Sequence, residues 1–230
     1  MKNHNNTTPH QAADYDGQIV NIIPGYACFH QEIINIVKAM KLKPNTWLDT
    51  GCGTGNLVKK AITEFPNTNF ILCDPSAEML RQAQKKLRDH TSGRLLFLKP
   101  IPTQDFPPGL CARPDIVTAI LSHHYLSPDE RKKATMACYN LLKEDGIYIT
   151  FENIRPNTVE GLEIGMEYWK NFQLEQGRDF ETVKSHLERF DREFFPITLE
   201  EHLNLLRETG FEVVEILWYS YMQAGFFAKK

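Results

Sequence analysis

The sequence has few of the features that tie a chain to a membrane, to secretion or to a disulfide scaffold. Its 230 residues include five cysteines, an odd number at wide spacings with no C-x-x-C pair, which argues against a disulfide framework or a zinc knuckle. No apolar run approaches the length that crosses a bilayer. The polar residues 1–11 contain no apolar signal segment, and we expect them to be disordered. These features predict a cytoplasmic protein that does not interact with membranes.

The charge balance also excludes some partners. The formal net charge is only −3, and no basic stripe runs along the chain, so direct docking on nucleic acid is not expected. Histidine, cysteine and acidic residues show no spacing typical of a metal site. With 42% hydrophobic residues, the composition is that of an ordinary globular core, and the length fits one domain with an added subregion.

The most informative segment is W-L-D-T-G-C-G-T-G at residues 47–55. An apolar run ends at Asp49, and Gly51, Gly53 and Gly55 follow at alternate positions. A helical pattern begins near Asn56, and a second apolar run over residues 70–73 ends at Asp74. Glycine is needed where the backbone turns with positive φ or where a ligand lies against it. The pattern predicts a nucleotide-binding strand–turn–helix–strand unit, in which an acid roughly 20 residues after the loop bonds the ribose hydroxyls.

The loop also indicates which nucleotide is bound. Dinucleotide sites read G-x-G-x-x-G, whereas Asn56 occupies the last glycine position here. The carboxylate of Asp49 would repel a pyrophosphate but would favour a phosphate-free ligand with a cationic amino-acid end. The segment closely resembles motif I of the class I S-adenosylmethionine (SAM)-dependent methyltransferases, and Asp74 matches the ribose-binding acid of that family. The resemblance covers about residues 25–152 and 199–230.

Alternating apolar strands and amphipathic helices predict an α/β fold. The resemblance implies a Rossmann-like, mostly parallel seven-stranded sheet with an antiparallel last strand and a helical insertion. We expect a tail and cofactor cover over residues 1–30, a SAM-binding core over 31–152, a helical substrate cap over 153–197, and a C-terminal helix and β-hairpin over 198–230. Four prolines between residues 100 and 108 predict an extended loop over residues 99–112.

The resemblance also implies roles for individual residues. Asp49 and the glycine loop would face the methionine part of SAM, Asp74 would hold the ribose, and Met79 would flank the adenine. The Asp that often follows strand three to bind adenine is missing, so this role passes to the backbone near Ile101 or to the side chain of Thr103 or Gln104. The full set expected to bind the cofactor is Tyr15, Tyr26, Asp49, Gly51, Cys52, Gly53, Asp74, Pro75, Met79, Ile101, Thr103, Leu121 and Ser122. For Tyr15 and Tyr26, packing on the domain is the alternative.

Methyl transfer from SAM, which leaves S-adenosylhomocysteine (SAH), requires alignment of the nucleophile and the methyl group and the exclusion of water. A base is needed only if the acceptor must lose a proton. His123 and His124, at the end of the fourth strand, are the candidate bases, and a structural role is the alternative. Neighbouring strand residues point in opposite directions, so one ring is expected to face the site and the other the core. Glu152, Arg155 and Trp169 are candidate contacts to a small-molecule acceptor.

Other functions stay open at this point. The Pro24-Gly25-Tyr26 segment, the aromatic-rich insertion and residues 210–229 also resemble the carboxy-SAM synthases, enzymes that remodel SAM and serve tRNA wobble modification. A non-catalytic SAM-binding module fits the same residues. A nicotinamide dehydrogenase is disfavoured by Asp49 and Asn56. The sequence is compatible with a monomer or a homodimer.

Overall fold

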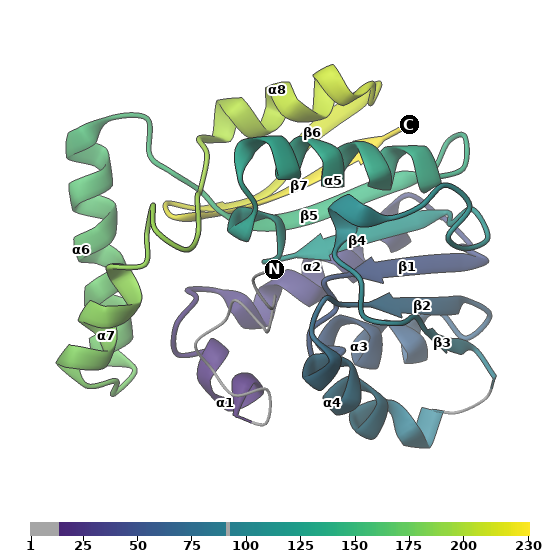
Figure 1. Ribbon diagram of the computed structural model, residues 1–230, viewed down its shortest axis with the longest axis horizontal. Coiled ribbons are helices and arrows are strands. Elements are labelled where there is room, and N and C mark those ends of the chain that lie inside the picture. Colours follow the sequence, from purple (N-terminus) through teal and green to yellow (C-terminus); the bar gives the residue numbers. More distant parts are fainter. Residues whose placement is uncertain (1–13, 91–92) are drawn as a thin grey trace.

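A computed structural model describes residues 14–90 and 93–230 (Figure 1). The expectation of disorder over residues 1–11 concerns a segment outside the described residues. The described strands form one seven-stranded sheet in the order β3-β2-β1-β4-β5-β7-β6. The first five strands are parallel, and β7 runs antiparallel to both β5 and β6, as predicted. The strand bounds are β1 Thr46–Thr50, β2 Asn69–Cys73, β3 Leu95–Phe97, β4 Ile116–Ile120, β5 Ile147–Asn153, β6 Val213–Ser220 and β7 Gln223–Lys229.

Helices cover both faces of this sheet (Figure 1). Because side chains alternate along a strand, Trp47 packs with the helices of one face while Leu48 packs with those of the other. This double burial explains why the parallel strands are apolar throughout. The first face carries α2 (Tyr26–Ala39), α3 (Asn56–Glu64) and α4 (Ala77–Leu87), and the second carries α5 (Pro128–Leu141) and α8 (Leu199–Thr209).

Local sequence signals fix where several helices begin and end. Ser127 and Glu130 form a capping box at the start of α5, with Pro128 in the first turn. Thr198 and Glu201 form a second capping box at the start of α8. Gly210 ends α8 with a φ of 113°, a conformation that favours glycine.

The remaining helices gather at the end of the sheet to which the parallel strands point (Figure 1). They are α1 (Tyr15–Ile19), α6 (Val159–Glu175) and α7 (Phe180–Leu187), the last two lying in the predicted helical insertion. The Trp169 indole donates a hydrogen bond of 2.6 Å to the Ile22 carbonyl, so α6 is tied to the segment that follows α1. None of the helices in the described ranges is both long and apolar enough to cross a membrane.

Two local predictions differ from the structure. The proline-rich loop over residues 99–112 contains a short 3₁₀ turn at Thr103–Asp105. The histidine pair lies on a 3₁₀ turn, His123–Tyr125, and not on the end of a strand. In both places the chain leaves a strand and must change direction, which a fully extended backbone cannot do.

Candidate functional site

The site is built where the sheet order reverses. The chain proceeds outward from β1 to β3 and then returns to β4 on the other side of β1, so the carboxyl ends of β1 and β4 flank a crevice. Leu121, directly after β4, has a φ of 51°, a left-handed conformation that is unusual for a leucine. Backbone strain of this kind clusters at functional sites.

The glycine loop lies against this crevice. A Cβ on Gly51, whose φ is 62°, would come within 2.5 Å of the Ser122 Cβ, so only glycine lets the two strand ends approach so closely. A Cβ on Gly53 would meet nothing within 4 Å, because this part of the loop faces open space. The loop therefore presents bare backbone to whatever fills the crevice.

Two buried carboxylates stand at adjacent strand ends. Asp49 accepts a hydrogen bond of 2.7 Å from the Thr118 hydroxyl, and burial raises its pKa to about 7. Asp74 accepts hydrogen bonds from the backbone N–H groups of Gly53 (2.9 Å) and Ser76 (2.8 Å), and burial raises its pKa to about 6. Neither carboxylate forms an ion pair with a described residue. Two buried acids without a cation fit a ligand that carries a positive charge.

The larger cavity of the crevice has a volume of about 240 Å³. Asp74, Gly51 and Gly53 line it, as do the predicted Pro75, Met79, Thr103, Leu121 and Ser122. Thr103 shares a hydrogen bond of 2.6 Å with Thr50. The buried Gln104 Oε1 and Ser122 Oγ atoms have no hydrogen-bond partner among the described residues. Such orphaned atoms suit a polar planar ligand.

Ile101 is not among the described residues that line the cavities of the crevice. Its backbone N–H donates to the Asp74 carbonyl at 3.3 Å, and its own carbonyl lies 3.2 Å from the Cys73 thiol. The Ile101 side chain packs on the core. Its backbone thus holds the loop in place and leaves Gln104 as the nearby group that faces the cavity.

A smaller cavity of about 30 Å³ continues from the first one toward α2. Asp49, Cys52 and the predicted Tyr26 line it. So do His30 and Asn56, which the sequence did not single out as site residues. His30 follows Tyr26 by four residues on a helix, and this spacing places the two side chains on one helical face.

The N-terminal helix α1 closes the crevice. Tyr15 lines both cavities described above and a third one, so its ring stands where the three meet. The next residue, Asp16, accepts hydrogen bonds from Thr54 (2.5 Å) and Asn56 (2.8 Å) and pairs with Lys86 at 2.5 Å. We call these contacts of Asp16 the N-terminal clasp. The clasp fixes Tyr15 above the glycine loop.

The third cavity, also about 30 Å³, lies beyond Tyr15 on the side of the helical insertion. We call it the acceptor cavity. Its wall is mostly apolar, with polar groups from three residues besides the tyrosines. The lining is Tyr15, Ile19, Ile22, Ile23, Leu121, His124, Tyr125, Asn153, His186 and Phe194.

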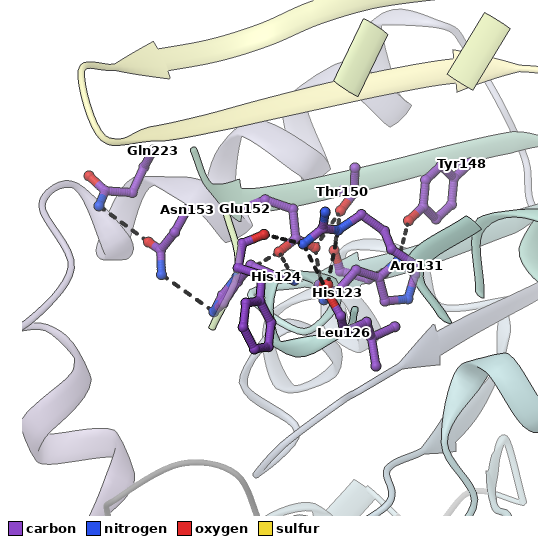
Figure 2. Close-up of polar contacts among 11 residues, drawn as sticks. His123, His124, Leu126, Arg131, Tyr148, Thr150, Glu152, Asn153 and Gln223 are labelled. Carbon is purple, nitrogen blue, oxygen red and sulfur yellow. Dashed lines mark hydrogen bonds and ion pairs between the residues drawn. The ribbon is translucent and has the colours of Figure 1, made fainter. Parts of the chain in front are cut away.

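His124 is the polar group of this cavity whose orientation is most firmly set (Figure 2). Its Nδ1 lies 2.6 Å from Oε2 of Glu152, and the backbone N–H groups of His123 and His124 donate to the same carboxylate. Burial would raise the pKa of Glu152, but the hydrogen bond from His124 and the nearby histidine rings outweigh it and keep the pKa low. An ionised Glu152 only accepts, so Nδ1 of His124 carries a proton, and in the neutral ring Nε2 is the nitrogen that accepts.

The amide of Asn153 is oriented to match this tautomer. Gln223 donates to the Asn153 carbonyl oxygen at 3.3 Å, which leaves the Asn153 amino group facing Nε2 of His124 at 3.4 Å (Figure 2). The hairpin strand β7 thus supports the site through Gln223. The sequence indicated neither residue.

His123 has other contacts. Its Nδ1 lies 3.2 Å from the Tyr148 hydroxyl (Figure 2). The residue lines the 240 Å³ cavity of the crevice and also a separate small cavity with Arg131 and His202. Burial lowers the pKa of His123 to about 4, so the ring is neutral near pH 7. Of the pair, only His124 lines the acceptor cavity.

The three predicted substrate contacts, Glu152, Arg155 and Trp169, do not line the acceptor cavity. Glu152 is buried against the His124 ring and holds it in place. Arg155 pairs with Asp191 and lies over the Phe190 ring, 4.9 Å from its centroid. Trp169 is fully buried, with its indole bonded to the Ile22 carbonyl. Both brace the insertion against the core. Phe194 and His186 of the insertion line the cavity instead.

Comparison with known proteins agrees with this geometry. Residues 48–148 match the family model described as a methyltransferase domain. The match, the sheet order and the switch-point site together support a SAM-dependent methyltransferase domain, with SAM as its cofactor. Two structures of this fold contain bound SAH.

The chain is also similar in sequence to carboxy-SAM synthases. The enzyme from Staphylococcus epidermidis is 25% identical over 212 residues, which cover 91% of this chain and 89% of that protein. A SAM-dependent methyltransferase from Clostridium acetobutylicum shares the fold with a TM-score of 0.64 and 21% identity, over 95% of this chain and 96% of that one. A proposed O-methyltransferase from Nostoc punctiforme has a TM-score of 0.68 and 16% identity. The match covers 95% of this chain, which spans 60% of that one.

Proposed function

We propose that the protein transfers the methyl group of SAM to a small molecule bound in the acceptor cavity. The observation that carries the proposal is the position of Tyr15, which separates the cofactor crevice from a small, mostly apolar cavity that the His124 ring enters. Bound SAM supplies an electrophilic methyl group, whose bond to sulfur breaks as the bond to the acceptor forms. The thioether leaves as a neutral group and needs no proton.

The residues of the crevice divide the binding of SAM among them. Asp49 lines the smaller cavity beneath the glycine loop and binds the ammonium group. Asp74 keeps lone pairs for the ribose hydroxyls after accepting its two backbone bonds. Met79, Pro75 and Leu121 flank the adenine. This assignment follows the predicted roles and leaves the Gln104 carbonyl for the adenine edge.

His124 acts as the base. Glu152 fixes the tautomer in which Nε2 takes a proton from an acceptor hydroxyl, and it stabilises the imidazolium that forms. The apolar wall of Ile19, Ile22 and Phe194 excludes water from the reacting groups. Such a site fits an acceptor with an ionisable hydroxyl on an apolar or planar frame.

Mass spectrometry tests this function directly. The protein, incubated with SAM carrying a labelled methyl group and a panel of phenols, enols and carboxylic acids, is expected to form SAH and one labelled product. The His124→Gln variant serves as the matched control for background transfer. Conversion of SAM without any labelled acceptor would contradict the proposal.

A second candidate, formation of carboxy-SAM, is favoured by the similarity to carboxy-SAM synthases along 91% of the chain. The acceptor cavity argues against it, because none of its described lining residues is a lysine or arginine that could pair with the added carboxylate. Arg189 lies over the Phe194 ring and pairs with Glu193 at 2.6 Å. In the same mass spectra, a cofactor heavier than SAM by one carbon dioxide would favour this second function.

The orphaned carbonyl of Gln104 gives a further test of the cofactor site. The exocyclic amino group of adenine donates, whereas the oxo group of hypoxanthine accepts. We expect the wild type to bind SAH more tightly than S-inosylhomocysteine, and Gln104→Leu to lose roughly tenfold in SAH affinity together with this preference. Gln104→Glu keeps the acceptor and is expected to retain the preference in calorimetry. An undiminished preference in Gln104→Leu would assign adenine recognition elsewhere.

A further inference from the structure

The small cavity beneath the glycine loop holds several polar side chains to which the family resemblance assigns no role, and His30 is one of them. We call this cavity the amino-acid chamber; it is lined by Tyr15, Tyr26, His30, Asp49, Gly51, Cys52, Gly53, Thr54, Asn56, Leu57 and Ile120. His30 enters it from α2 and is only 5% exposed. Its ring packs edge-on against Tyr26, with 5.2 Å between the centroids.

The methionine end of SAM brings two opposite charges into this chamber. Asp49 can bind only the ammonium group, because an ionised carboxylate donates no hydrogen bond. The carboxylate of the ligand needs donors of its own. A buried carboxylate without donors would be strongly unfavourable.

Most donors of the chamber are already engaged. Thr54 donates to Asp16 at 2.5 Å, and the Asn56 amino group donates to Asp16 at 2.8 Å and to the Tyr26 hydroxyl at 3.4 Å. The Cys52 N–H is bonded to the Cys73 carbonyl. His30 differs, because neither ring nitrogen has a hydrogen bond to any residue in the described ranges. The Tyr26 hydroxyl, which accepts from Asn56, also keeps its proton to donate.

The charges around His30 favour an anion beside it. Burial, and then Lys60 on α3 and Lys86 on α4, lower its pKa to about 4, whereas Asp16 on α1 acts in the opposite direction. Tyr15 and Tyr26 are neutral, and Asp49 on β1 lies across the chamber. A neutral His30 offers one N–H, and the nearby lysines add a positive potential that a carboxylate would lower.

We propose that His30, together with the Tyr26 hydroxyl, binds the carboxylate of the methionine part of SAM. Asp49 then binds the ammonium group and His30 binds the carboxylate of the same amino-acid part of the ligand. The inference rests on the cofactor and not on the identity of the methyl acceptor. It makes His30 a determinant of which adenosyl thioethers the protein accepts.

Calorimetric titration with two ligands tests this role without turnover. One ligand is SAH, and the other is its decarboxylated analogue, which keeps the ammonium group. The wild type is expected to prefer SAH. The His30→Phe variant, which keeps a ring of similar size, should bind SAH roughly tenfold or more weakly while binding the analogue as the wild type does.

His30→Gln supplies the control, because its amide restores one N–H donor and should recover part of the preference for SAH. Equal losses for both ligands in His30→Phe would show that the ring only supports the fold, and unchanged affinities would show that it does not contact the carboxylate. Either result overturns the proposal. Failure of the wild type to bind SAH would instead overturn the cofactor assignment.

Discussion

Asp49→Asn is expected to weaken SAM binding by roughly a hundredfold or more. The variant keeps the shape of the side chain and the hydrogen bond with Thr118 but removes the charge that meets the ammonium group. Losing one partner of a buried charge pair costs about 3–5 kcal/mol, and each 1.4 kcal/mol is tenfold in affinity. Calorimetric titration with SAM measures the loss. Asp105→Asn makes the same chemical change on an exposed side chain near the crevice and should leave the affinity unchanged.

The same substitution is expected to weaken the pH dependence of the free energy of unfolding. Burial raises the pKa of Asp49 to about 7 from its ordinary value of 3.8, so between these pH values the folded state keeps a proton that the unfolded state has lost. The free energy of unfolding of the ligand-free protein therefore falls as pH rises through this range. Asp49→Asn removes the contribution of Asp49 to this decrease in the free energy of unfolding, while the contribution of Asp74, whose pKa is also raised, remains.

Urea unfolding at pH 5 and pH 8 measures the difference between the two proteins. SAM binding by the wild type should strengthen as pH rises toward 7, because the ligand requires the ionised carboxylate. If the free energy of unfolding of Asp49→Asn fell more steeply with pH than that of the wild type, Asp49 would not be a buried carboxyl with a raised pKa.

His124→Gln is expected to lower the rate of methyl transfer by roughly 10²- to 10⁴-fold with little change in SAM affinity. The reason is that a positioned base contributes about this factor to proton removal, while the ring lies in the acceptor cavity and not in the crevice. Single-turnover kinetics with the acceptor found by mass spectrometry, together with SAM titration, separate the two quantities. Equal losses in rate and in SAM affinity would contradict the role of a base.

The neighbouring histidine gives the matched comparison. His123→Gln alters a residue that contacts Tyr148 and lines the cofactor cavity but not the acceptor cavity, so the loss should appear in the free energy of unfolding and in SAM affinity and not in the rate at saturating SAM. Glu152→Gln should resemble His124→Gln in rate, because an amide no longer fixes the proton on Nδ1. A large loss of rate in His123→Gln with normal stability would reverse the assignment of the pair.

The class of protein, its sheet and its cofactor could be predicted from the sequence because their signals are local. The glycines, Asp49 and Asp74 lie within 28 residues of one another, and strand geometry alone brings them to one edge. The mostly parallel sheet with its antiparallel last strand is confirmed. The individual residue assignments stay predictions, although the structure places all of the cofactor set except Ile101 beside the crevice or the chamber.

The remaining site residues depend on packing between distant segments. His30 looks like any polar residue on an amphipathic helix until α2 is placed beneath the glycine loop. Trp169 and Phe194 both belong to an aromatic-rich segment, and only the fold shows that the first bonds to Ile22 while the second lines the acceptor cavity. Gln223 reaches Asn153 because β7 pairs with β5, a contact across 70 residues of sequence.

The N-terminal clasp implies an order of events in each cycle. Tyr15 stands between the cofactor and the acceptor cavity and is secured mainly by Asp16, whose partner Lys86 lies on a different helix. Exchange of SAH for SAM past Tyr15 would require Asp16 to release Thr54, Asn56 and Lys86. Opening of the N-terminal clasp, and not methyl transfer, would then limit the rate of repeated turnover. Added salt would increase this rate because it weakens the ion pair between Asp16 and Lys86.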